Sequence, residues 1–547
     1  MQPRPPSPTD GLSSYLAQPP VAALLLAVGA LAFLYNLSGL ELWGIDESGY
    51  IQRARELLAH QRWFAPTYLG ETNFDKPPLF YWLIAASGWI FGQSDAGFRA
   101  LFPLFGFVGA FLTLAIGTRL YDRTTGLVAA ILLSTSFLFL SYARKAFPDL
   151  PLTCSVAGAL WAYLRATAPG APVGRWCAVA ALCMTTGSLI KGLLAYVLPG
   201  LVIGLDLLAT RRVRVLRPLI AWSGITALAI AVPYYAATGW PFIRLFFFEH
   251  HWQRFLAWGS HRPLLYYLEF LPGDFLPWSF LLPAMLVALA SRDLRHDLRL
   301  PFLWAGSLLV FFTLSSHKWE PYLLPLFPAL ALLAARLWQR GWEGTLPRAV
   351  LRALQGGLLL EALVLVGVAL ALPALWPRRF SVPLPWSAWK SALLVAGALI
   401  LAERTLRRRV GQAFIVALGL AAVLTALVTG SLMPALNPMR SARLVAEQVL
   451  RTAAVPELGI YGDVNAAMVV YLAPGARVKV LPDGPEVTRY LADGQARAVL
   501  LDQRVADTIP PDPAGGHCLL LRAAYVDGRY LLLSNRCGAN ALSRRSR

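Results

Sequence analysis

The chain has 547 residues, of which 57% are hydrophobic and only 14% are charged, and its mean hydropathy is +0.54. This number of charged residues is too small to cover the surface of a water-soluble protein of this size. The chain is therefore expected to lie in a lipid bilayer. The formal net charge of +19 does not indicate a nucleic-acid partner, because the arginines stand in short clusters between apolar runs rather than in one basic domain or stripe.

Thirteen segments are predicted to be spanning helices, each of which needs roughly 20 predominantly apolar residues. The first follows Arg4 without a small-residue cleavage site, so it is predicted to be an uncleaved span. A further run, Leu79–Phe91, is short and interrupted by Ser87 and Gly88, and it is interpreted as a helix at the membrane interface. The thirteen spans are predicted near residues 21–40, 101–121, 127–142, 152–164, 176–190, 192–208, 219–237, 276–290, 302–315, 322–337, 356–375, 389–403 and 413–432.

The arginines assign the loops between these spans to the two sides of the membrane. One side is predicted to be cytoplasmic by the positive-inside rule, which places the N-terminus inside and the tail outside. The outer face then holds the loops 41–100 and 239–274, the loops around Asp149 and His317, and the tail. The arginine clusters lie in the segments 119–123, 165–175, 211–217, 292–299, 336–352 and 404–409.

A membrane domain over residues 1–433 and a small soluble α/β domain over residues 434–547 are predicted. The tail combines an amphipathic helix near 441–450 with short apolar or alternating runs typical of strands, at 458–461, 498–501, 518–521 and 530–533. It contains no phosphate-binding loop or dinucleotide fingerprint. Cys518 and Cys537 lie in this tail and are able to form a disulfide if the domain is extracytoplasmic.

The strongest polar motifs fall in the predicted outer loops. An acidic pair, Asp46–Glu47, follows Trp43 and Gly44 just after the first span. The others are Lys76-Pro77-Pro78, "RKAFPD" from Arg144 to Asp149, "FEHHWQRF" from Phe248 to Phe255, and "KWEPYLLPLFPALALL" from Lys318 to Leu333. Together they resemble the GT-C class of polyprenyl-phosphate-dependent glycosyltransferases, most closely aminoarabinose transferases and their protein O-mannosyltransferase relatives. The resemblance covers the membrane region and is weak in the tail.

In such an enzyme the polyprenyl phosphate is the leaving group, so cations must meet the negative charge that grows on its oxygens. Lys76 is the first candidate, because the two prolines that follow it restrict its backbone and begin the next helix. Arg144, Lys318 and Tyr322 are further candidates for the donor phosphate, together with Lys145. The alternative for each is a side chain that anchors a helix end at the interface.

Asp46, Glu47 and Asp149 are the candidate catalytic carboxylates. Asp46 is suited to activate an acceptor hydroxyl or to stabilise charge at the anomeric carbon. If the acceptor is a lipid A phosphate, as the resemblance implies, that acceptor is already anionic and needs no strong base. The alternative for Asp46 is a helix N-cap on the stretch that begins at Glu47.

Some aminoarabinose transferases are thought to hold a divalent metal between two outer loops, and this resemblance implies Asp75, His250 and His251 as ligands here, with zinc as the candidate ion. Adjacent histidines in a strand point to opposite faces, which makes a poor chelate unless the backbone bends. The alternative is an interfacial loop with aromatic anchors.

The predicted function is transfer of 4-amino-4-deoxy-L-arabinose, or a related sugar, from undecaprenyl phosphate to lipid A at the outer face of the bacterial inner membrane. A first alternative changes the acceptor to Ser or Thr of secreted proteins, as in O-mannosyltransferases, and requires Asp46 to act as a base. A second alternative, a lipid-carrier flippase or transporter, predicts polar residues through the depth of the spans, whereas Glu361 and Asp206 form no such chain.

Overall fold

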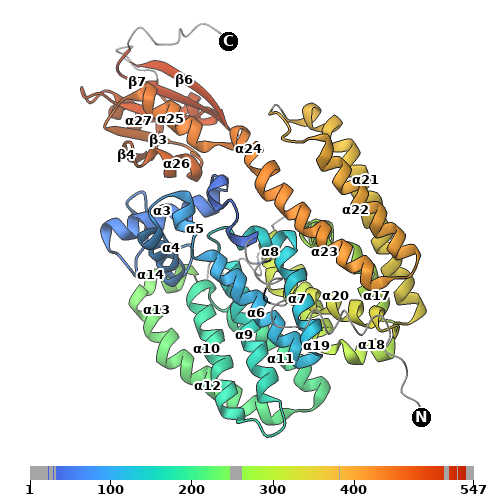
Figure 1. Ribbon diagram of the computed structural model, residues 1–547. Coiled ribbons are helices and arrows are strands. Elements are labelled where there is room, and N and C mark those ends of the chain that lie inside the picture. The colour runs from blue at the N-terminus through green and yellow to red at the C-terminus, as the bar shows by residue number, and fades with distance from the viewer. Residues whose placement is uncertain are drawn as a thin grey trace, which may run out of the picture.

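The computed structural model describes residues 23, 29, 32–42, 44–246, 262–380, 382–510, 517–525 and 528–537. Most of the first predicted span, Trp43 and the "FEHHWQRF" segment with His250 and His251 lie outside the described residues. Figure 1 shows a large helical body with a smaller α/β domain at one end, directly above the first loop.

The first loop folds into short helices, as predicted for a segment at the interface. It contains α3 (Ile45–His60), α4 (Pro78–Phe91) and α5 (Asp95–Arg99), with a short hairpin of β1 (Thr67–Tyr68) and β2 (Glu71–Thr72) between α3 and α4. The 14 residues of α4 reach only about 21 Å at the helical rise, which is short of the bilayer's hydrocarbon thickness.

Six helical stretches of the described chain are long and apolar enough to cross a membrane, and a bent pair raises the number to seven. These helices indicate a multi-pass membrane protein, while the count of thirteen stays a prediction. The difference has a physical cause, because several predicted spans are interrupted: the segment 127–142 breaks at Ser136 into α7 (Arg123–Thr135) and α8 (Phe137–Tyr142). The six stretches are Asp95–Leu120, Val173–Lys191, Leu216–Thr238, Glu320–Trp342, Arg348–Arg379 and Val410–Ala453.

Polar contacts gather the loops into two groups that agree with the partition made by the arginines. Asp297 accepts from Arg336 (Nε to Oδ2, 2.9 Å), and the side chain of Gln339 donates to Asp122 (2.7 Å). Both contacts join loops predicted to be cytoplasmic. At the other end, the hydroxyl of Tyr267 accepts from the amide of Trp319 (3.2 Å), and this contact joins two loops predicted to be outside. Which group faces the cytoplasm stays a prediction.

The C-terminal residues form a five-stranded sheet of order β4-β3-β5-β7-β6, in which the first three strands are parallel and the last two antiparallel. Four of its strands contain the predicted ones, and the missed strand is β4, an edge strand of sequence RVKVL in which two of the five residues are charged and three are exposed. The strands are β3 (Glu457–Tyr461), β4 (Arg477–Leu481), β5 (Ala498–Asp502), β6 (Cys518–Tyr525) and β7 (Gly528–Ser534), and the helices are α25 (Ala442–Ala453), α26 (Ala466–Leu472) and α27 (Gly484–Leu491).

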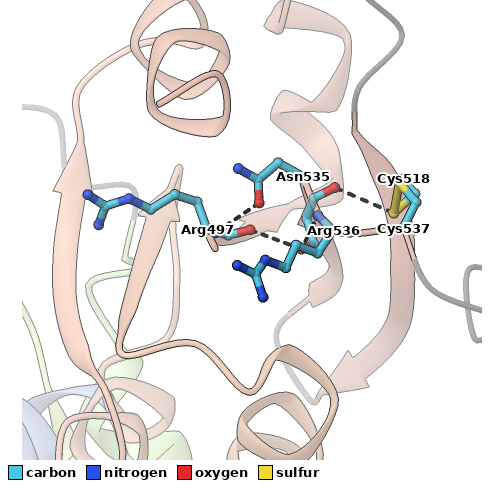
Figure 2. Close-up of a disulfide and its surroundings, with 6 residues drawn as sticks. Arg497, Cys518, Asn535, Arg536 and Cys537 are labelled. Atoms are coloured by element: carbon cyan, nitrogen blue, oxygen red, sulfur yellow. Dashed lines mark hydrogen bonds between the residues drawn. A yellow bond between two sulfur atoms is a disulfide. The ribbon is translucent and has the colours of Figure 1, made fainter. Parts of the chain in front are cut away.

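A disulfide joins Cys518, at the start of β6, to Cys537 just beyond β7, with 5.7 Å between the two Cα atoms. Figure 2 shows that Arg497 and Asn535 exchange hydrogen bonds beside it (Arg497 amide to Oδ1, 2.9 Å). The disulfide therefore joins the two arms of the β6–β7 hairpin at its open end.

The α/β domain contacts the first loop through polar groups. The Tyr471 hydroxyl of α26 donates to Asp95 (2.5 Å), which also pairs with Arg443 of α25 (2.8 Å). Arg55 of α3 donates to the carbonyl of Val470 (2.7 Å). The helix that carries Asp46 and Glu47 thus packs between the helical body and this domain.

Candidate functional site at the outer-loop end

Asp46 and Glu47 lie in the first turn of α3, and Gly44 occupies the N-cap position. The N-cap interpretation of Asp46 is therefore wrong, since the helix begins one residue before it. Desolvation by burial raises the pKa of the Asp46 carboxyl, the positive charge of Lys76 lowers it, and the charges of Asp75 and Asp149 raise it further. Asp46 thus lies within the electric field of the other predicted site residues.

Glu47 is fully engaged in a buried ion pair. Its two oxygens accept from Arg99 (Nε to Oε1, 2.8 Å, and Nη2 to Oε2, 2.6 Å), and Oε1 also accepts from the amide of Ala146 (2.8 Å). Burial raises the pKa of this carboxyl, but Arg99 outweighs that effect, so the pKa is lowered overall. Glu47 is held as a carboxylate that ties α3 to α5 and to the "RKAFPD" loop. No sequence pattern indicated that Arg99 is its partner, because 52 residues separate them.

Lys76 stands just before α4, whose N-cap is Pro77 and whose first residue is Pro78. Its ammonium donates to Asp75 (2.9 Å). The paired side chains are largely but not fully buried, with 16% of Lys76 and 23% of Asp75 exposed, so the pair remains open to a ligand.

Asp149 is the first residue of α9 (Asp149–Ala166), and it forms a buried ion pair with Lys191, the last residue of α10 (Val173–Lys191). Sequence reasoning missed Lys191 as a site residue. The signal was present, since this lysine interrupts an otherwise apolar run between two predicted spans on the same face as the Asp149 loop.

One aromatic cluster connects these groups. The ring of Phe147 packs against Tyr50 (5.7 Å between centroids), Tyr142 (5.0 Å) and Trp319 (5.9 Å), and Trp319 packs against Tyr322 (6.2 Å). A lysine ammonium lies over each of three rings, with distances from Nζ to the ring centroid of 5.3 Å for Lys76 over Tyr50, 5.2 Å for Lys145 over Tyr142 and 4.8 Å for Lys191 over Tyr322. Cations are attracted to the faces of such rings, so the aromatic cluster holds three positive charges around Phe147.

A cavity of about 210 Å³ lies beside this cluster and is lined by Asp46, Glu47, Arg144 and Lys145. Its walls are mostly apolar and come from helices far apart in the chain. Burial lowers the pKa of the Lys145 ammonium. We call this space the Asp46 cavity.

Two of the side chains predicted to bind the donor phosphate form hydrogen bonds to backbone carbonyl groups instead. Arg144 donates to the carbonyls of Ala32 (2.8 Å) and Asn36 (3.1 Å), and Lys318 donates to that of Ser315 (2.8 Å). These contacts brace helix ends, as in the alternative interpretation of both residues, and their role at a phosphate stays a prediction. Tyr322 instead lies at the site, beneath Lys191.

No group of three or more His, Cys, Asp or Glu side chains able to hold a metal ion occurs among the residues described. Asp75 pairs with Lys76, and His250 and His251 lie outside the described part of the chain. A metal at Asp75, His250 and His251 therefore stays a prediction.

Comparisons with known proteins agree with this arrangement. A family model described as dolichyl-phosphate-mannose-protein mannosyltransferase matches residues 75–236. An undecaprenyl phosphate-alpha-4-amino-4-deoxy-L-arabinose arabinosyl transferase of Pseudomonas paraeruginosa is 33% identical over 325 residues, which cover 57% of this chain and 58% of that protein. For transferase 1 of Pseudomonas fluorescens, the identity is 32% over 323 residues, 57% of this chain and 56% of the relative. The chain thus spans a little over half the length of these relatives.

The fold is matched over more of the chain. The crystal structure of ArnT from Cupriavidus metallidurans bound to undecaprenyl phosphate has a TM-score of 0.74 at 22% identity, and the match covers 95% of this chain and 99% of that chain. The resemblance predicted from the motifs is therefore confirmed: this chain is similar in sequence to the undecaprenyl phosphate aminoarabinose transferases, and it shares the fold of ArnT.

Proposed function

We propose that this protein is a glycosyltransferase that moves 4-amino-4-deoxy-L-arabinose from undecaprenyl phosphate to a phosphate of lipid A. The observation that carries the proposal is the position of Asp46, which lines an apolar-walled cavity and lies within the field of Lys76, Asp75 and Asp149. A lipid-linked donor needs a cation for its phosphate beside a carboxylate near the anomeric carbon, and Lys76 and Asp46 supply both.

In the proposed reaction an oxygen of the acceptor phosphate attacks the anomeric carbon of the donor. The bond between that carbon and the phosphate oxygen of the donor breaks, and its electron pair leaves with undecaprenyl phosphate. The donor phosphodiester becomes a monoester as the acceptor monoester becomes a diester, so charge balances without proton transfer. Attack from the face opposite the leaving group inverts the anomeric centre.

Lys76 binds the donor phosphate and stabilises the charge that grows on it, an effect that is typically large where donors are preorganised in a water-poor site. Its pairing with Asp75 and its contact with the Tyr50 ring fix the ammonium before the donor arrives. Tyr322, beneath Lys191, is suited to contact the same donor. Arg144 and Lys318 support the loops around the phosphate through their bonds to the backbone.

Asp46 positions the sugar and stabilises positive charge at the anomeric carbon, since the anionic acceptor requires no general base. Glu47 keeps α3 in place through Arg99 rather than meeting the substrate. Asp149 holds Lys191 at the aromatic cluster. The three predicted carboxylates therefore have three different tasks.

The outer face of the inner membrane is the proposed site of the reaction. The disulfide between Cys518 and Cys537 supports this side, because such bonds persist in the periplasm and are rare in the cytosol. The α/β domain that carries it rests on α3, so both belong to one side of the bilayer.

The test is transfer by the purified full chain in detergent, from undecaprenyl phosphate carrying radiolabelled aminoarabinose to lipid A or to a Ser/Thr-rich peptide. We expect label in lipid A. Label in the peptide would support O-glycosylation, the reaction suggested by the family model that matches residues 75–236, and would contradict the proposed acceptor. Label in neither would contradict the proposed donor or the transferase activity itself.

A further inference from the structure

Lys145 differs from the other two lysines of the aromatic cluster. Lys76 pairs with Asp75, and Lys191 pairs with Asp149. The Lys145 ammonium contacts the ring of Tyr142, but it forms no hydrogen bond or ion pair with any residue that the structure describes. Among the residues described, it is therefore the lysine of this cluster that has no bonded counter-ion.

No carboxylate among the described residues forms an ion pair with the Lys145 ammonium. Glu47 and Glu320 act on it electrostatically, but the oxygens of Glu47 are already bonded to Arg99 and to the Ala146 amide. A half-buried cation without a bonded counter-ion loses part of its hydration without compensation, and an anionic ligand would supply the missing negative charge.

The lining of the Asp46 cavity combines charged and apolar side chains. Its charged lining consists of the cations Lys145 and Arg144, the ion pair of Glu47 with Arg99, and the carboxylates of Asp46 and Glu41. The Arg144 Nε is buried without a hydrogen-bond partner in the described structure. The facing walls are apolar and include Leu40, Phe137, Leu140, Val428 and Met433. A ligand that suits both parts carries an anionic group next to an apolar one, as the phosphate end of a lipid does.

We infer that the Asp46 cavity is the acceptor site and that Lys145 binds the phosphate monoester of the acceptor lipid. This assignment rests on the proposed function and deepens it, because it separates the two phosphates of the reaction. Lys76 binds the donor phosphate and Lys145 binds the acceptor phosphate. Asp46 lines the cavity, and the positive charge of Lys76 lowers the pKa of its carboxyl. Two phosphates at one cation would repel each other strongly in a site of low dielectric.

The first test uses Lys145→Gln in the full chain, with Lys390→Gln as the matched control. Lys390 also lies over tryptophan rings, Trp386 (6.0 Å) and Trp389 (5.8 Å), but on α22 (Ala388–Leu406) rather than at the cavity. Losing one charge-assisted bond should raise the KM for lipid A by about tenfold to a hundredfold. The KM for the undecaprenyl phosphate donor should not change, Lys145→Arg should restore much of the loss, and Lys390→Gln should behave as the wild type.

The second test measures the melting temperature of the protein with lipid A alone, without donor. Lipid A should stabilise the wild type, whereas lipid A stripped of its phosphates should stabilise it less, and Lys145→Gln should respond equally to both lipids. In the absence of lipid, Lys145→Gln should melt no lower than the wild type, because the substitution removes a half-buried charge that has no bonded counter-ion among the described residues.

The outcomes separate this inference from the proposed function. Transfer to lipid A by the wild type with an unchanged acceptor KM in Lys145→Gln would overturn the role of Lys145 alone. A raised KM for the donor instead would assign Lys145 to undecaprenyl phosphate. If the wild type neither transfers sugar to lipid A nor is stabilised by it, the proposed function fails, and the acceptor site fails with it.

Discussion

The two ends of the helical body both gather charged residues, but they use them differently. At the end opposite the α/β domain, Asp297 meets Arg336 and Arg340, and Asp206 meets Arg299 and the hydroxyl of Tyr163. At the outer-loop end, Lys145 has no bonded counter-ion in the part of the chain that the structure describes, the pKa of Asp46 is raised, and a cavity lies beside them. Paired charges hold neighbouring helices together, whereas incompletely paired charges beside a cavity indicate a ligand-binding site.

The largest expected effect concerns the buried brace at the outer-loop end. Glu47→Ala leaves Arg99 buried and unpaired, and the free energy of unfolding should fall by about 3–5 kcal/mol. Asp297→Ala, at the opposite end, breaks pairs that are largely but not fully buried, and it should cost less than the loss of the fully buried pair. Thermal unfolding of the purified proteins in detergent compares the two. Equal losses would contradict the distinction between a fully buried ion pair and a partly exposed one.

The disulfide should matter next, and only for the α/β domain. Cys537→Ser removes a link across a sequence separation of 19 residues. Chain-entropy arguments put the loss in stability at roughly 3 kcal/mol. Limited proteolysis should release the α/β domain from this variant sooner, while the helical body stays intact. Free, reactive Cys518 and Cys537 in wild-type cells kept without reductant would contradict the assignment of this end to the periplasm.

A smaller effect should appear in the pH dependence of transfer. The raised pKa of Asp46 means that its carboxylate is lost, as pH falls, earlier than that of an ordinary aspartate. Because the negative charge of Asp75 contributes to this rise, Asp75→Asn should lower the pKa and shift the acid limb of the rate profile to lower pH. A shift to higher pH, or none, would show that Asp46 does not govern that limb.

The smallest effect is expected for the exposed pairs at the opposite end. Asp293 is 68% exposed where it meets Arg340 (2.6 Å), and such pairs contribute about 0–1 kcal/mol. Asp293→Ala should therefore leave both the melting temperature and the rate of transfer almost unchanged. A marked loss of transfer would show that this end takes part in the reaction.

Much of the site could be predicted because the membrane topology and the positions of the motifs determine which residues lie on the same face. The arginine pattern assigned the loops of Asp46, Lys76 and Asp149 to one face, and the structure brings these residues within one electrostatic environment. The partners could not be predicted in the same way. Lys191 reaches Asp149 across 42 residues, and only the three-dimensional fold reveals that contact.

The fold was predictable to a similar degree. The sheet and the interfacial helices follow from alternating and amphipathic patterns, but the count of spans does not follow from hydropathy alone. Breaks such as that at Ser136 divide an apolar run without changing its composition. The hydrogen bonds of Arg144 and Lys318 to the backbone could not be predicted either, because every residue has a carbonyl group and the sequence does not show which one a side chain will reach.

The most direct test of the account compares the two ends in a single assay of sugar transfer from radiolabelled undecaprenyl phosphate aminoarabinose to lipid A. Lys76→Ala should lower the rate by about a hundredfold to a thousandfold, the loss typical of removing one preorganised donor, while the protein stays folded. Arg336→Ala, which removes a cation from the opposite end, should retain most of the wild-type rate. Full activity in Lys76→Ala, or an equal loss in both variants, would contradict the claim that the outer-loop end carries the chemistry.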